Sequence, residues 1–151
     1  NGKSGIGGQV PQIDATRNLA LYRSLTNSMS NGLVASAHDC SDAGLAAAMT
    51  ECCFGCDSGA VLEISSLFNH NKNLDIWGAL FGESLGRILV SVKPQDSQLF
   101  EESMINHECN KIGKVTSNDM IIFNNRDKII LSANMKELRE AWKGTLNGGN
   151  N

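Results

Sequence analysis

The sequence contains no apolar run that approaches the roughly 20 residues of a membrane-spanning helix. No charged and then apolar signal segment opens it either. An excess of basic residues is also missing, because 13 Lys and Arg stand against 16 Asp and Glu, for a formal net charge of -3. That balance disfavours nonspecific binding to nucleic acids. We therefore expect a cytoplasmic protein whose partners are neither membranes nor nucleic acids.

Cysteines are few and lack the spacing of a metal site. Cys53 and Cys56 form a C-x-x-C motif, but no second pair of ligands at similar spacing completes a structural zinc site. The odd total of five fits a reducing compartment better than a disulfide framework. We expect Cys52 and Cys53 to pack as small apolar side chains near the end of a helix. A redox or zinc site at Cys53 and Cys56 is the alternative.

Length and composition predict one globular domain. The chain has 151 residues, 41% hydrophobic and 19% charged, which is ordinary for a folded protein with its own core. Residues 1–13 are rich in glycine, contain Pro11 and have no preceding strand, so they match neither a P-loop nor a dinucleotide motif. We expect residues 1–13 to be a linker from an upstream domain, 14–146 a single domain, and 147–151 a disordered tail.

Hydrophobic periodicity and turn residues predict five helices and six strands. The expected helices are 14–30, 42–55, 74–81, 95–107 and 134–142, and the expected strands are 33–37, 59–64, 87–92, 111–115, 120–123 and 128–131. The periodicity turns these side chains inward: Ala15, Leu19, Tyr22, Leu25, Met29, Trp77, Leu80 or Phe81, Leu99, Phe100, Met104 and Ile105. Early alternation of helices and strands, with a late hairpin, predicts a mixed β-sheet with packed helices, in the α/β or the α+β class.

One polar cluster falls at a predicted junction between a strand and a helix. His38, Asp39, Ser41 and Asp42 lie there, followed by Gly44, whose backbone would allow a ligand to approach closely. Backbone N–H groups at such a junction favour anions, and an Asp pair can hold Mg²⁺ bridged to phosphate. The junction therefore resembles a phosphate or nucleotide site. The alternative is that Ser41 or Asp42 caps the helix while His38 satisfies a carbonyl group.

A second cluster, Gly82–Arg87, is a glycine-bracketed polar turn that leads into the strongest predicted strand. Glu83 in this turn could bind a metal ion or a ribose hydroxyl, and Arg87 could pair with Glu83 or with a phosphate. The alternative is a surface turn with an Arg–Glu ion pair worth at most about 1 kcal/mol.

Together, the two segments resemble the phosphoribosylformylglycinamidine synthase family. His38–Leu45 carries His-Asp-x-Ser-Asp, and Leu80–Val92 carries Phe-Gly-Glu-Ser-x-Gly-Arg before a strand. The resemblance is to the C-terminal domain of the synthetase subunit, and it extends over nearly the whole chain. It implies the fold of the aminoimidazole ribonucleotide synthetase C-terminal domain. The wider superfamily includes selenophosphate synthetase and thiamine monophosphate kinase, which remain alternatives.

The resemblance implies part of an ATP- and glutamine-dependent ligase that amidates formylglycinamide ribonucleotide in purine synthesis, with ATP and Mg²⁺ as cofactors. Asp39 would be a Mg²⁺ ligand, and Ser41 would contact a nucleotide or substrate phosphate. Glu83 and Ser84 match a turn that contacts the substrate in the pseudo-symmetric partner domain. Expected partners are the upstream domains of the same enzyme, a glutaminase subunit or domain, and the ribonucleotide substrate.

Two positions depart from the family pattern. Ala43 stands where the family usually has Gly, and Leu85 replaces a frequent Gln. These departures favour a domain whose site is structural or auxiliary. The resemblance also implies that preceding domains supply most of the ATP-binding elements, so we expect the isolated chain to be inactive. A noncatalytic scaffold or binding domain, pairing with another copy through a sheet edge, is the alternative from a different class.

Overall fold

The computed structural model describes residues 13–55, 58–69 and 74–146. Cys56, most of the predicted linker and the predicted tail lie outside these ranges, so the predicted domain bounds and the C-x-x-C motif stay predictions. The elements, in chain order, are α1 Ala15–Ser30, β1 Ser36–Asp39, α2 Gly44–Phe54, β2 Gly59–Glu63, η1 Ser65–Phe68, α3 Ile76–Phe81, β3 Ile88–Ser91, η2 Pro94–Asp96, α4 Ser97–Ser103, β4 Gly113–Thr116, β5 Met120–Asn125, β6 Lys128–Asn134 and α5 Met135–Leu146. No helix in the described ranges has both the length and the apolarity to cross a bilayer.

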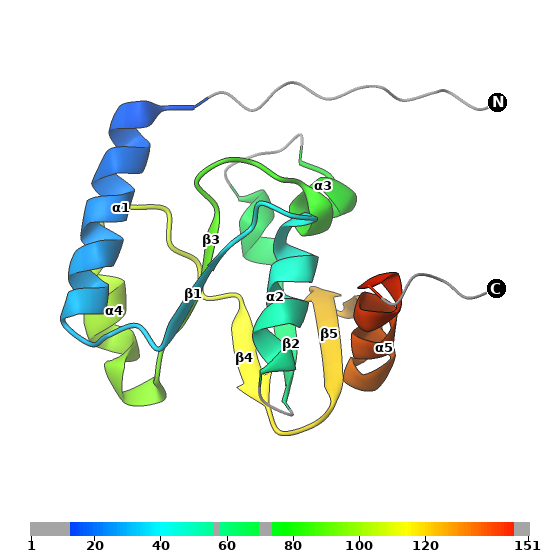
Figure 1. The fold of residues 1–151 in the computed structure, drawn as a ribbon. Helices are drawn as coiled ribbons and strands as arrows, with labels where there is room; N and C mark the ends of the chain where they lie inside the picture. Colours follow the sequence, from blue (N-terminus) through cyan, green and yellow to red (C-terminus); the bar gives the residue numbers. More distant parts are fainter. Residues whose placement is uncertain (1–12, 56–57, 70–73, 147–151) are drawn as a thin grey trace, which may run out of the picture.

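The strands form two sheets, which confirms a mixed β-sheet with packed helices. The larger sheet has the order β4-β2-β5-β6, in which β2 and β5 are parallel and the outer pairs antiparallel. The smaller sheet pairs β1 with β3 antiparallel, with Asp39 opposite Ile88. Figure 1 shows α2 lying over the larger sheet with α5 to one side, whereas α1 and α4 lie together at the other end of the molecule.

Alternating side chains of the larger sheet build the main core with α2. Leu62, Ile121 and Phe123 are at most 2% exposed, and they pack with Leu45 and Met49 of α2. Alanine at three consecutive positions favours a helix and lets it approach the sheet closely. Cys53 is buried in the same core, which agrees with the expectation that it packs as a small apolar residue.

Helix α1 confirms the predicted N-cap but presents a different face. The Asp14 carboxylate accepts a hydrogen bond from the backbone N–H of Arg17. The buried positions are Leu25 and Ser28, whereas the predicted inward residues Ala15, Leu19, Tyr22 and Met29 are exposed. The serine hydroxyl bonds Ser103 of α4 across the interface, at 2.8 Å. Leu25 is therefore buried as predicted, but the observed inner face is rotated toward Ser28, because a buried serine does not register as apolar in the periodicity.

Several other side chains that were predicted to point inward are exposed. Trp77 is 63% exposed, Leu99 57% and Ile105 78%, so these predictions were wrong, while Leu80, Phe100 and Met104 are buried as expected. α4 ends at Ser103 and not at the predicted residue 107, so Ile105 lies beyond the helix, whereas Trp77 and Leu99 lie on the exposed faces of the short helices α3 and α4. β1 begins three residues later than predicted, because its register is set by pairing Ser36 with Ser91 of β3.

Candidate functional site

The two polar clusters of the sequence contact each other. The backbone N–H of Cys40, just after β1, donates to the carbonyl oxygen of Arg87 at 3.0 Å. The backbone N–H of Ala43, just before α2, donates to a carboxylate oxygen of Glu83 at 2.9 Å. We call the two segments His38–Leu45 and Leu80–Arg87 together the turn region. The end of β1, the start of α2 and the turn after α3 thus form one structural unit.

The backbone at the start of α2 is left-handed at two consecutive residues. Ala43 has φ 53° and Gly44 has φ 69°. A β-carbon on Gly44 would lie 2.7 Å from the carbonyl carbon of Phe81 and within 3 Å of two carbonyl oxygens of the same segment. Glycine is therefore needed at position 44 to bring α2 against the end of α3. The backbone at the end of α3 makes this close approach, and a role for Gly44 in binding a nucleotide or substrate stays a prediction.

Glu83 occupies the helix N-terminus that was expected to face an anion. The predicted helix cap at Ser41 or Asp42 is wrong, because the N-cap is Ala43 and no side-chain cap bond forms there. Instead, the Glu83 carboxylate accepts the Ala43 N–H from 40 residues away. A carboxylate at this end of the helix also interacts favourably with the helix dipole. A role for Glu83 or for the exposed Ser84 in binding substrate stays a prediction.

Arg87 fastens the end of α3 to the start of β3. Its guanidinium donates to the carbonyl oxygens of Gly82 at 2.9 Å and Ala79 at 2.8 Å. These groups belong to the last turn of the helix and the residue after it, where carbonyls lack helical partners. Among the described residues Arg87 forms no ion pair with Glu83, so the predicted alternative of an Arg–Glu pair is wrong.

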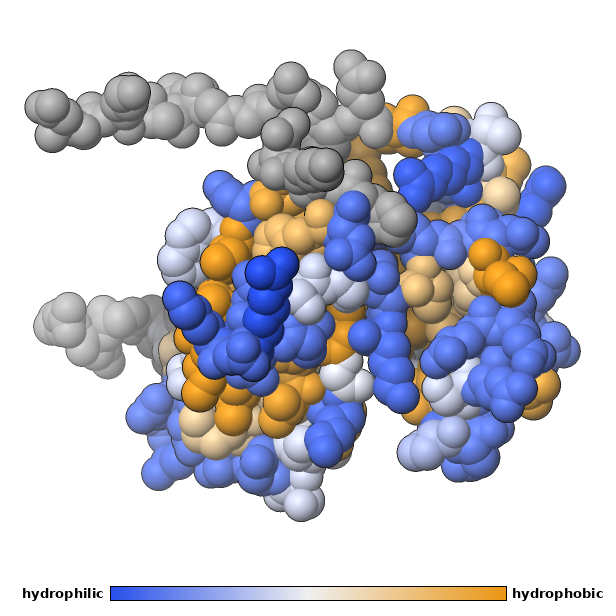
Figure 2. Space-filling view, turned by 180° about the vertical axis from the view of Figure 1, so that it is seen from behind, coloured by the Kyte–Doolittle hydropathy of each residue, from blue (hydrophilic) through white to orange (hydrophobic). Residues whose placement is uncertain are grey.

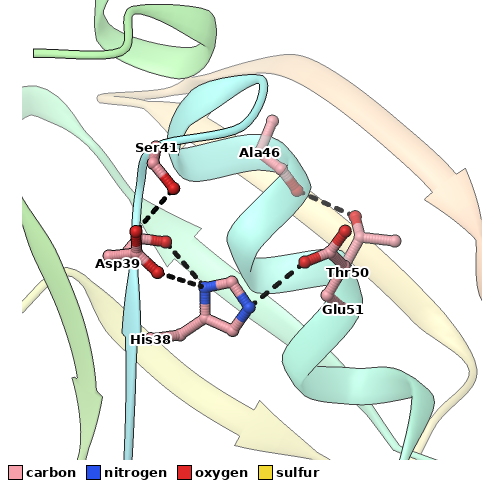
Figure 3. Close-up of polar contacts among 6 residues, drawn as sticks. All are labelled: His38, Asp39, Ser41, Ala46, Thr50 and Glu51. Atoms are coloured by element: carbon pink, nitrogen blue, oxygen red, sulfur yellow. Dashed lines mark hydrogen bonds and ion pairs between the residues drawn. The ribbon is translucent and has the colours of Figure 1, made fainter.

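Asp39 and Ser41 are exposed at the end of β1 and are joined by a hydrogen bond (Figure 3). The Ser41 hydroxyl donates to Oδ2 of Asp39, whose side chain is 68% exposed. This hydrogen bond, helped by a backbone hydrogen bond and by the neighbouring His38, lowers the pKa of the Asp39 carboxyl. Asp39 therefore presents a full negative charge to the surface at neutral pH.

His38 bridges β1 to the middle of α2 (Figure 3). Its Nδ1 donates to the carbonyl oxygen of Asp39 at 2.6 Å, which confirms the expectation that it satisfies a carbonyl. Its Nε2 lies 3.1 Å from Oε2 of Glu51. Sequence reasoning missed Glu51, although a single carboxylate within an otherwise apolar helix was a usable signal.

The described residues could supply only part of the ligand set of a Mg²⁺ ion. Within the described ranges, no group of three His, Cys, Asp or Glu side chains could hold a metal ion. Mg²⁺ commonly takes one or two carboxylates and completes its shell with water and phosphate oxygens. The exposed Asp39 carboxylate, with Ser41 beside it, suits that partial role. The buried Cys40 thiol is unsuited to metal binding or attack, because burial raises its pKa.

Comparisons with known proteins identify one family and several solved structures that share this fold. Residues 2–123 match the family described as AIR synthase related protein, C-terminal domain. Thermotoga maritima PurL complexed with FGAR aligns over 85% of this chain and 22% of its own, with 19% identity and a TM-score of 0.77. The same enzyme complexed with ATP aligns over 78% and 21%, with 20% identity and a TM-score of 0.70.

A more distant structure has the same fold. Escherichia coli HypE, a hydrogenase maturation protein, aligns over 76% of this chain and 38% of its own, with 16% identity and a TM-score of 0.58. At these identities the likeness concerns the fold alone. The chain spans about a fifth of the length of the PurL chains.

Proposed function

The chain belongs to the family of AIR synthase related proteins, as their C-terminal domain, and from that premise we propose that it is part of a phosphoribosylformylglycinamidine synthase. That enzyme would use ATP and Mg²⁺, with ammonia from a glutaminase partner, to amidate formylglycinamide ribonucleotide in the cytoplasm. The similar solved structures include Thermotoga maritima PurL complexed with FGAR and with ATP, and a phosphoribosylformylglycinamidine synthase II from the same organism. The fold and the combined motifs support the same role here, and a HypE-like role has the weaker fold match.

The observation that carries this proposal is the hydrogen bond from Ala43 N–H to Glu83. It ties the two family motifs into one unit and leaves Asp39 and Ser41 exposed at its edge. In the proposed role, the charged Asp39 holds Mg²⁺ and Ser41 orients the carboxylate. Bound Mg²⁺ would neutralise phosphate charge. Glu83 and Arg87 keep the edge rigid.

Calorimetry of the full chain with ATP, with and without Mg²⁺, tests the proposal. We expect binding that depends on Mg²⁺ and that weakens about tenfold or more in Asp39→Asn. Glu102→Gln, which removes an exposed carboxylate on α4, is the matched control and should bind as the parent does. Unchanged binding by a folded Asp39→Asn variant would instead favour the noncatalytic scaffold.

An activity assay tests the expected dependence on neighbouring domains. The chain spans only about a fifth of the PurL chains, so most elements that surround the reacting groups would lie elsewhere. We therefore expect no ATP hydrolysis and no amidation above background from the chain by itself. Turnover by the chain, lost in Asp39→Asn, would show that this domain holds a complete active site.

A further inference from the structure

A cavity of about 420 Å³ lies between helices α2 and α5 and strands β5 and β6. Its volume falls within the roughly 300–1,000 Å³ typical of small-molecule sites. Alanines of α2 and apolar side chains of the strands form much of its lining, and Phe54, Phe81 and Trp142 contribute aromatic rings. Figure 2, from behind, shows hydrophobic residues gathered on the side of the molecule that holds α5, whereas the side that holds α1 and α4 is mostly hydrophilic.

The aromatic rings of the cavity are partly accessible. Phe81 is 42% exposed and Trp142 is 50% exposed, so a ligand could reach both rings. Phe54 and Trp142 contact each other with ring centroids 5.5 Å apart. The guanidinium carbon of Arg139 lies 5.9 Å from the centroid of the Phe54 ring. One ring of the cavity thus already attracts a cation within the protein.

Glu51 gives the cavity its charge. It is the one ionisable side chain among the described lining residues, which include no Lys, Arg or His. Its Oε2 faces His38, while its Oε1 accepts no hydrogen bond from the described residues. The hydroxyl of Thr50 donates to the carbonyl oxygen of Ala46, so this side chain can only accept a hydrogen bond from a ligand. Ser132 also lines the cavity, and its hydroxyl can donate or accept, whereas Glu51 and Thr50 both call for a donor.

We propose that this cavity binds a small planar aromatic ligand whose edge carries a cationic or N–H-donating group, such as an amidinium. The ring would pack against Phe81 and Trp142, and the donating edge would bond Oε1 of Glu51. Aromatic packing and charge complementarity would act together, because the carboxylate lies at the border of an apolar surface. The site contains none of the residues proposed to bind Mg²⁺ or phosphate, so it stands or falls independently of the proposed function.

Three probes of one shape and different charge test the proposal. Benzamidine, benzamide and benzoate carry positive, neutral and negative groups on the same ring. Binding to the full chain would be followed by the fluorescence of Trp142 in a Trp77→Phe background, which removes the other tryptophan and keeps an aromatic ring beside Phe81. We expect benzamidine to bind about tenfold more tightly than benzoate, with benzamide between them.

Two variants locate the site and its charge. Glu51→Gln should bring the three affinities to within about twofold of one another, because the carboxylate supplies the preference. Ala47→Phe should abolish binding of all three, because position 47 is half-exposed and lines the cavity, and this substitution adds no tryptophan to the fluorescence signal. Glu102→Gln, on the distant α4, is the matched control and should leave all three affinities unchanged. Equal affinities in the parent, a charge preference that survives Glu51→Gln, or binding that survives Ala47→Phe in a folded protein would each overturn the proposal.

Discussion

The turn region and the larger sheet are held by different interactions. Leu62, Ile121 and Phe123 at the centre of the sheet are almost inaccessible to water. The turn region is held by single polar contacts, such as the hydrogen bond from the Ala43 N–H to the Glu83 carboxylate. It also contains two left-handed backbone conformations. Left-handed conformations of residues other than glycine cost free energy and persist only where the surroundings impose them. The packed sheet thus provides the stability that lets the turn region keep an unfavourable but defined shape.

Removing the largest side chain of the sheet core should have the largest effect. Phe123 is fully buried, and Phe123→Ala should lower the free energy of unfolding by about 4 kcal/mol. The rigid sheet cannot collapse into the space that the missing ring leaves. Urea denaturation measures the loss. Ile129→Ala on the neighbouring strand is the control, and at 65% exposure it should cost less than about 1 kcal/mol. Equal losses would contradict a core centred on the sheet.

Adding one methyl group to the turn region should be the next most damaging change. Gly44→Ala should cost about 3 kcal/mol, because the methyl meets the Phe81 backbone and φ is positive. Two other glycines separate these causes. Gly32 has positive φ in open space, so Gly32→Ala should cost about 1 kcal/mol. Gly55 has neither feature, so Gly55→Ala should change the stability by less than about 0.5 kcal/mol. If Gly44→Ala cost no more than Gly32→Ala, α2 would not be packed tightly against α3.

The Glu83 contact should matter less, because it lies at the surface. Glu83→Ala should lower the free energy of unfolding by about 1 kcal/mol and speed hydrogen exchange of the Ala43 N–H, which loses its acceptor. Glu83→Gln keeps an acceptor oxygen and should retain most of the protection. Protection of Ala43 that is identical in all three proteins would mean that the contact does not join the two motifs in solution.

Local signals predicted most of the fold. Asp14 caps α1 as expected, and the predicted hairpin forms with a two-residue turn between β5 and β6. Asn134 also begins the last helix as expected, accepting a hydrogen bond from the N–H of Lys136. These features depend on residues that are close in sequence. Propensity, capping and alternation therefore suffice to predict them.

The features that the sequence could not predict depend on contacts between residues that are far apart in the chain. Glu83 is 40 residues from Ala43 in the sequence, so the residues near Ala43 do not indicate that a carboxylate accepts a hydrogen bond at the N-terminus of α2. Trp77 was expected inside because it is large and apolar, yet it stacks on Phe81 at the surface of α3. The motifs identified the two segments of the turn region. Only the tertiary structure shows that these segments contact each other.

The smallest predicted effect concerns the charge of Asp39. Ser41→Ala removes the hydroxyl that donates to Asp39, so the pKa of this carboxyl should rise, whereas Ser41→Thr should keep it low. A lowered pKa in the folded state stabilises the protein above the pKa of the unfolded chain, and this contribution disappears as the pH falls through the folded-state pKa. In Ser41→Ala this contribution should therefore be smaller, and its loss should be complete at a higher pH than in the parent.

An NMR titration of the Asp39 carboxyl carbon measures the pKa directly, and Phe123→Ala provides the comparison with the sheet core. That substitution should leave the pKa of Asp39 unchanged while the protein remains folded, because the carboxyl is exposed and its main partner is two residues away. An unchanged pKa in Ser41→Ala would instead assign the low value to the backbone and His38. A shift in Phe123→Ala would show that packing of the sheet, as well as the local hydroxyl, controls the charge offered to a ligand.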